Sequence, residues 1–99
     1  MCGIIGIVGD YNNTNDIING LKSLEYRGYD SCGIAGLVQN KFIEAKSISK
    51  INDLEKIIKK NKINTKISIA HTRWATHGKP SLVNTHPFIK NNCALVHNG

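Results

Sequence analysis

Residues 2–8 read Cys2-Gly3-Ile4-Ile5-Gly6-Ile7-Val8, a short and continuously apolar run. Gly9 and Asp10 follow it, and both are residues that commonly form turns. A run of this length without polar alternation predicts a strand that is buried on both faces. We therefore expect the fold to be organised around a sheet that contains residues 2–8.

Outward from this strand, helical and strand patterns alternate along the chain. Apolar residues at helical spacing predict a helix over about residues 15–25, and Gly28 is a plausible stop for it. Two short runs on either side of Gln39 and Asn40 predict a hairpin. The full expected order is a strand (2–8), a helix (15–25), a hairpin (33–38 with 42–47), a helix (near 51–58), a strand (66–72), a long loop (73–87) and a hairpin (88–90 with 93–97). This order indicates a mixed α+β domain.

The length of 99 residues limits the chain to one small domain with a modest core. Apolar residues make up 40% of it and charged residues 20%, which fits a globular protein rather than a disordered one. The longest apolar run is far too short to span a bilayer, and no basic segment precedes an apolar stretch at the start. We therefore expect a cytoplasmic protein without a membrane partner.

A formal net charge of +6 raises the question of nucleic-acid binding. The lysines are spread along the chain without interleaved aromatic residues. One cluster lies at the end of the second expected helix: Lys56, Lys59, Lys60 and Lys62. Basic side chains there complement the helix dipole and keep that face in water. We therefore expect a solvated helix face and no nucleic-acid partner.

Cysteine and histidine usage argues against disulfides and metal sites. Cys2, Cys32 and Cys93 form an odd set without a close pair, and we expect the last two to be small buried residues. Four histidines lie in the second half of the chain: His71, His77, His86 and His97. Their spacings of six, nine and eleven match no common zinc motif. We expect core or hydrogen-bonding loop histidines, no metal and no cofactor.

Cys2 directly follows the initiator methionine, a position that suggests an N-terminal nucleophile. Methionine is usually trimmed before a small residue, which would leave an α-amine and a thiol on one residue. The reference pKa is ~7.7–8.0 for the amine and ~8.5 for the thiol, so the amine can take the thiol proton near neutral pH. One residue would then supply both nucleophile and base. The alternative is a small buried side chain at the start of a strand.

The long loop opens with the string His71-Thr72-Arg73-Trp74-Ala75-Thr76-His77-Gly78-Lys79-Pro80-Ser81. Arg73 is one of only two arginines, and its planar fork suits a carboxylate. Trp74 is the only tryptophan and follows directly. With two hydroxyls and a histidine nearby on a long loop, these residues suggest a clamp for a small molecule. The alternative is a surface loop with one ion pair and a capping tryptophan.

Asn98 and Gly99 place a side-chain amide and a backbone N–H next to each other. Both groups can point at one developing oxyanion, and loss of such a donor costs ~2.7–4 kcal/mol of transition-state stabilisation. An Asn-Gly pair is also a common turn, so both interpretations stay open at this point.

Four strings, in order, resemble the class II glutamine amidotransferases: CGIIGIVG (2–9), EYRGYDS (25–31), HTRWATHGKPS (71–81) and HNG (97–99). The resemblance covers essentially the whole chain, and its second and third strings are the most specific. Within the family, the strings are most similar to the branch that transfers ammonia from glutamine to fructose 6-phosphate, forming glucosamine 6-phosphate.

The resemblance implies a role for each candidate residue. Cys2 would attack the side-chain amide of L-glutamine, and Asn98 with Gly99 would form the oxyanion hole. Arg27 would lie beside the nucleophile and help to position it. The resemblance assigns substrate binding to four residues of the long loop: Arg73, which would hold the α-carboxylate, Trp74, which would cover the site, and Thr76 and His77, which would line the pocket.

The resemblance also implies a fold and a domain extent. We expect part of a four-layer αββα sandwich of the N-terminal-nucleophile hydrolase type. Residues 1–99 would be an incomplete type-2 glutamine amidotransferase (glutaminase) domain, inactive alone, without the later glutaminase segment and the sugar isomerase domains that would bind fructose 6-phosphate. The full-length protein would be a homodimer. The alternatives are a non-catalytic fragment or glutamine-binding remnant, and a related class II enzyme with another acceptor.

Overall fold

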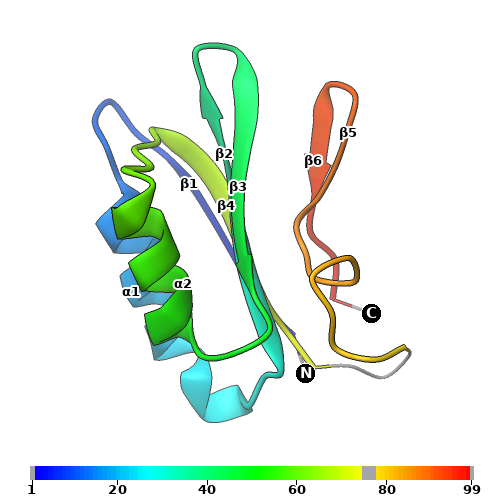
Figure 1. Cartoon of the computed structure of the whole chain (residues 1–99). Coiled ribbons are helices and arrows are strands. Elements are labelled where there is room, and N and C mark those ends of the chain that lie inside the picture. Colours follow the sequence, from blue (N-terminus) through cyan, green and yellow to red (C-terminus); the bar gives the residue numbers. More distant parts are fainter. Residues whose placement is uncertain (1, 75–77, 99) are drawn as a thin grey trace.

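The computed structural model describes residues 2–74 and 78–98, which form a sheet, two helices and a separate hairpin (Figure 1). The helices and strands follow one another as β1 (Gly3–Val8), α1 (Thr14–Ser23), β2 (Ser31–Val38), β3 (Lys41–Ser47), α2 (Ile51–Lys60), β4 (Ile67–Arg73), β5 (Phe88–Lys90) and β6 (Cys93–Leu95). A 3₁₀ turn, η1 (Glu25–Arg27), follows α1. The expected order of elements and the α+β class are confirmed.

The four longer strands form an antiparallel sheet in the order β1-β4-β2-β3. The expected β2–β3 hairpin turns at Gln39 and Asn40, whose positive φ angles of 50° and 64° are those of a tight hairpin turn. β4 inserts between β1 and β2 although it comes last of the four in sequence. This insertion brings the loop after β4 to the end of the sheet where β1 begins.

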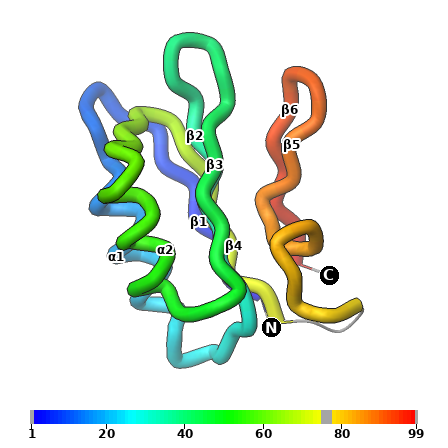
Figure 2. Tube along the Cα trace, viewed as in Figure 1, coloured from blue at the N-terminus to red at the C-terminus, as the bar shows by residue number. Residues whose placement is uncertain are grey.

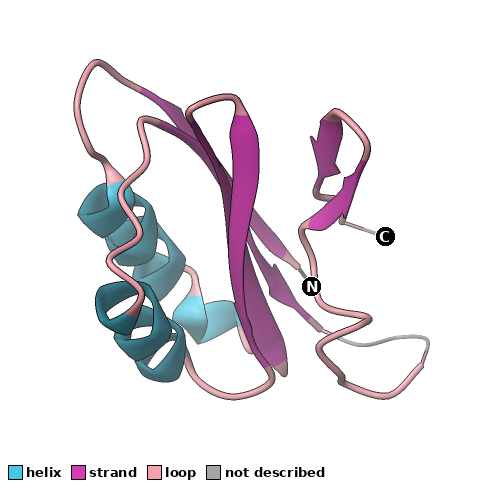
Figure 3. Ribbon diagram, turned by 45° about the horizontal axis from the view of Figure 1, so that its top comes forward, coloured by secondary structure: helices cyan, strands magenta, loops and turns pink. Residues whose placement is uncertain are grey.

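The molecule is layered. α1 and α2 cover one face of the sheet, and the β5–β6 hairpin lies on the opposite face (Figures 1 and 3). The core between the helices and the sheet contains fully buried side chains from all three elements: Ile17 and Leu21 of α1, Leu54 of α2 and Ile34 of β2. Complete burial of such a side chain stabilises the fold by ~1.5–3 kcal/mol. The described residues thus supply a helical layer and two sheet layers.

The expectation that the first strand is buried on both faces is wrong. Ile5 and Ile7 pack against the core, whereas Ile4 and Val8 are 44% and 80% exposed. β1 is an edge strand with the helices on one face, and the described residues do not cover these two side chains on the other. An apolar run indicates which residues favour burial, but not which elements are present to bury them.

Two expectations about the cysteines have different outcomes. Cys32 is fully buried in the core, as expected. Cys93 is exposed, which corrects the expectation that it is buried. It pairs with Lys90 beside the Asn91–Asn92 turn, so it lies at the tip of a short hairpin rather than within a layer.

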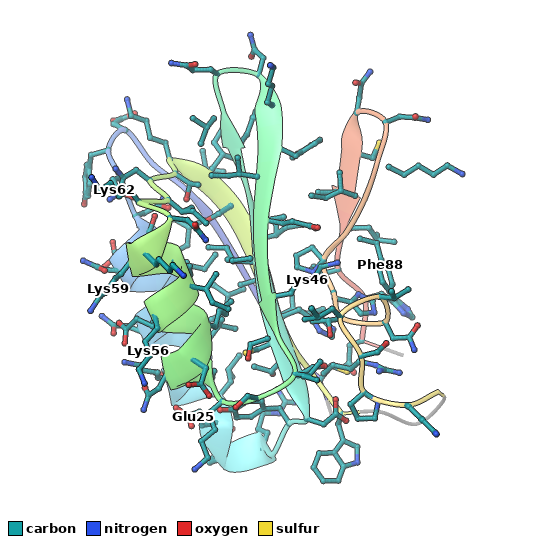
Figure 4. The ribbon with its side chains drawn as sticks, viewed as in Figure 1. Glu25, Lys46, Lys56, Lys59, Lys62 and Phe88 are labelled. Carbon is teal, nitrogen blue, oxygen red and sulfur yellow. The ribbon has the colours of Figure 1, made fainter. Side chains whose placement is uncertain are left out.

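The lysine cluster of α2 is solvated, as expected. The side chains of Lys56 and Lys59 are 81% and 70% exposed, and both point away from the sheet (Figure 4). Among the described residues, neither helix has the length and apolar character that crossing a membrane requires.

Candidate active site

One end of the sheet brings together the start of β1, the end of β4 and the start of β2. Gly3 pairs with Thr72, and Ser31 pairs with Arg73. The Gly3 N–H also donates to Thr72 Oγ1 at 3.0 Å. Because β1 and β4 are antiparallel, extension of their register by one residue places Cys2 opposite Arg73. The expected nucleophile and the expected carboxylate-binding residue therefore lie at the same end of the sheet.

Cys2 also contacts the far end of the described chain. Cys2 is 7% exposed, and its backbone N–H donates to Asn98 Oδ1 at 3.3 Å. The two ends of the described chain therefore lie at the same end of the fold (Figure 2). The Asn98 amide carries two N–H donors on Nδ2, directed away from the oxygen that accepts from Cys2. Asn98 is thus held beside Cys2 with donors suited to a negatively charged oxygen; Met1 and Gly99 lie outside the described residues.

Arg73 and Trp74 leave β4 at this end of the sheet. Arg73 is half-buried, and its Nη1 donates to the Lys79 carbonyl at 3.5 Å. Trp74 is 51% exposed, and a Cβ built at Gly28 would lie 3.2 Å from Trp74 Cζ3. Gly28 has a φ of 77° and caps η1 rather than α1, which ends at Ser23, so it is not the helix stop that its position predicted. The expected pocket residues Thr76 and His77 lie outside the described residues.

Arg27 lies in η1, the turn that leads from α1 to β2. Leu24, just before this turn, packs against the start of β1, because a Cβ built at Gly3 would lie 2.7 Å from Leu24 Cδ1. The turn is therefore anchored next to the residue that follows Cys2. A direct contact between the Arg27 side chain and Cys2 stays a prediction.

A pair of stacked histidines beside the site is the feature that sequence reasoning missed. The rings of His71 and His86 lie 4.2 Å apart at an angle of 18°, and His71 Nε2 lies 2.8 Å from the His97 backbone oxygen. Burial lowers the pKa of both rings, that of His86 to about 4. Strand alternation could have placed His71 on the face of Arg73, but the approach of His86 comes from distant sequence.

The chain belongs to the class II glutamine amidotransferases, whose family description matches residues 1–99. Its structure is similar to that of the glutamine phosphoribosylpyrophosphate amidotransferase from B. subtilis, complexed with ADP and GMP. The TM-score is 0.74 at 26% sequence identity, over 95% of this chain and 20% of that chain. This similarity confirms the expected fold, part of an N-terminal-nucleophile hydrolase sandwich.

Among curated relatives, the chain is similar to glutamine–fructose-6-phosphate aminotransferase (isomerizing) from several bacteria. It is 52% identical over 100 residues to the Helicobacter pylori protein and 50% identical over 101 residues to the Clostridium perfringens protein. Both alignments cover the whole of this chain and 17% of the relative. The chain therefore spans about a sixth of the length of these relatives.

Proposed function

We propose that this chain forms the glutamine-hydrolysing site of an aminotransferase that makes glucosamine 6-phosphate from fructose 6-phosphate. The observation that carries the proposal is the hydrogen bond from Cys2 N–H to Asn98 Oδ1, at the end of the sheet that Arg73 occupies. A nucleophile, an amide donor and a carboxylate-binding side chain are thereby close together. The three groups suit hydrolysis of the glutamine side chain, because they can attack the amide, stabilise the oxyanion and bind the α-carboxylate.

Removal of Met1, which precedes any turnover, leaves the Cys2 nitrogen as a free α-amine. The amine takes the thiol proton, directly or through a water, and the thiolate attacks the side-chain carbonyl carbon of glutamine. The C–N bond of the tetrahedral intermediate then breaks, and the proton on the amine leaves with the nitrogen as ammonia. Water attacks the glutamyl thioester, which releases glutamate and restores the thiol.

The site residues act on different parts of glutamine in this proposal. The Arg73 fork binds the α-carboxylate and so directs the side-chain amide toward Cys2. Asn98 Nδ2 and the Gly99 N–H donate to the oxyanion that forms during attack. Trp74, half-exposed beside the site, covers the bound substrate. The remaining expected contributors are Thr76 and His77, in the pocket, and Arg27, beside the nucleophile.

The acceptor is proposed from the relatives. The relatives that are 50–52% identical over the whole chain have fructose 6-phosphate in their names. The phosphoribosylpyrophosphate amidotransferase, whose name contains a different acceptor, is only 26% identical. Sugar isomerase domains that bind fructose 6-phosphate would lie outside these 99 residues, and the homodimer stays a prediction. We also propose a cytoplasmic location, which the three unpaired cysteines support because thiols stay reduced there.

The test uses the intact protein that contains this chain. Cys2→Ala should abolish the formation of glucosamine 6-phosphate from glutamine, while added ammonia should still support it. Cys93→Ala, which changes an exposed thiol away from the site, is the matched control and should leave both activities unchanged. Mass spectrometry of the active protein should find Cys2 at its N-terminus.

Four outcomes would decide against the proposal. Full glutamine-dependent activity in Cys2→Ala, or Met1 retained in the active enzyme, would contradict the nucleophile. A wild-type protein that binds glutamine without hydrolysing it would favour the non-catalytic binding module. Transfer of ammonia to a phosphoribosyl acceptor instead of fructose 6-phosphate would favour the related class II enzyme.

A further inference from the structure

A row of residues crosses the sheet on the face that meets the hairpin. Strand pairing aligns one residue from each strand: Ile4, His71, Gly33 and Lys46. The segment before β5 lies on this row, because the His86 ring stacks on His71 and a Cβ built at Gly33 would clash with the His86 carbonyl. Lys46 Nζ lies 5.8 Å from the centre of the Phe88 ring (Figure 4). The hairpin is thus fixed on the sheet directly over His71.

The surroundings of His71 favour a proton on one particular ring nitrogen. It is fully buried, and its Nε2 lies 2.8 Å from the His97 backbone oxygen. A carbonyl oxygen only accepts, so Nε2 carries the proton and donates it. Nδ1 is buried without a hydrogen-bond partner among the described residues, which is consistent with a ring nitrogen that carries no proton. Burial also lowers the pKa of His71, which favours the neutral form of the ring.

The acceptor of this bond is next to the oxyanion site. The His97 carbonyl belongs to the peptide unit that immediately precedes Asn98. β6 ends at Leu95, so residues 96–98 have already left the β5–β6 pairing. Two hydrogen bonds join this segment to the main sheet: His71 Nε2 to the His97 carbonyl, and Cys2 N–H to Asn98 Oδ1. The first fixes the backbone from which the Asn98 side chain projects, and the second fixes the side chain.

We propose that His71 is a positioning residue that keeps the Asn98 amide aimed at the oxyanion. This inference rests on the proposed glutamine hydrolysis. His71 acts through the His97 peptide unit, so loss of its donor lets the Asn98 amide move relative to Cys2. A misplaced donor stabilises less of the charge that develops only in the transition state. Ground-state binding of glutamine depends on Arg73, so kcat should fall while KM changes little.

Three variants of the intact protein test this role. His71→Phe keeps a ring stacked on His86 and deletes the donor, whereas His71→Gln loses the ring and places an amide N–H near the position of Nε2. His86→Phe is the matched control, because it keeps a stacked ring and leaves the His71–His97 bond intact.

We expect His71→Phe to lower kcat for glutamine hydrolysis by ~tenfold or more. The decrease should be smaller than the ~10²–10³-fold decrease in kcat that loss of an oxyanion donor itself causes. KM should stay within about twofold, because a group that acts only in the transition state leaves ground-state binding unchanged. His71→Gln should recover most of the lost kcat, and His86→Phe should keep the wild-type value. Alkylation of Cys2 by iodoacetamide, which requires no oxyanion hole, should proceed equally in wild type and His71→Phe.

The failure of this inference is distinguishable from that of the proposed function. An unchanged kcat in His71→Phe, alongside an active wild type, would overturn the positioning role. Equal loss of kcat in the Phe and Gln variants would overturn it as well, because it would point to packing instead of the donor. Absence of glutamine hydrolysis in the wild type, or its survival in Cys2→Ala, would overturn the proposed function instead.

Discussion

Gly33→Ala tests whether the close approach of the hairpin to the sheet holds the site together. Gly33 lies opposite His71 in the sheet, and a Cβ there would lie 2.2 Å from the His86 carbonyl oxygen. Ordinary Cβ contacts begin at 3.4 Å, so the His86 backbone would have to move by about 1.2 Å. A backbone oxygen cannot rotate away as the end of a flexible side chain can. The segment that carries the His86 ring must therefore shift away from His71.

The expected cost follows from the size of this overlap. Overpacking of a close contact destabilises a protein by ~1–3 kcal/mol. Each kcal/mol lowers the Tm by ~2–8 °C, depending on the size of the cooperative unit. We therefore expect the Tm of Gly33→Ala to fall by at least ~2 °C, at the low end of both ranges. The kcat of glutamine hydrolysis should fall too, because the displaced hairpin leads directly into Asn98.

Gly6→Ala is the matched control, because its Cβ would meet Ile69 Cγ2 at 3.8 Å, an ordinary contact. Both variants of the intact protein would be followed by thermal unfolding in circular dichroism and by glutaminase assay. Gly33→Ala should be lower than wild type in both measurements, and Gly6→Ala in neither. If the two variants had the same Tm and the same kcat, the reasoning from this contact would be refuted.

Two further predictions concern substrate binding and pH. Arg73→Lys should raise the KM for glutamine roughly tenfold or more and change kcat less, because a point charge replaces a planar fork; steady-state kinetics check this, and an unchanged KM would contradict the assignment. Acidification from about pH 6.5 to about pH 4 should destabilise the fold, because burial lowers the pKa of His86 to about 4, so the unfolded chain binds a proton first. Melting curves at pH 7 and pH 5 should show a smaller difference in His86→Phe than in wild type, and equal differences would exclude His86 as the cause.

Much of the local structure could be predicted from the sequence. Helical spacing of apolar residues located both helices, and Gln39-Asn40 located the hairpin turn that their positive φ angles confirm. Gly28, predicted to stop the first helix, instead ends the 3₁₀ turn that follows α1, with a φ of 77°. Such features depend on neighbouring residues, so a short stretch of sequence contains the information that specifies them.

The sequence predicts the candidate site as a set of residues but not as an arrangement. Four strings identified the family and named Cys2, Arg73 and Asn98 without any knowledge of their separation. The hydrogen bond between Cys2 and Asn98 and the pairing of Arg73 with Ser31 are visible only in the fold.

The sequence alone therefore determined the elements, their order and the family, and it predicted the residues of the candidate site. Tertiary structure decided that β4 inserts between β1 and β2, that one face of β1 stays exposed, and that His86 stacks on His71 beside the Asn98 segment. The physical reason is the range of the interactions. Propensity and turn geometry act over a few neighbouring residues, whereas strand pairing and ring stacking depend on which distant surfaces bury one another.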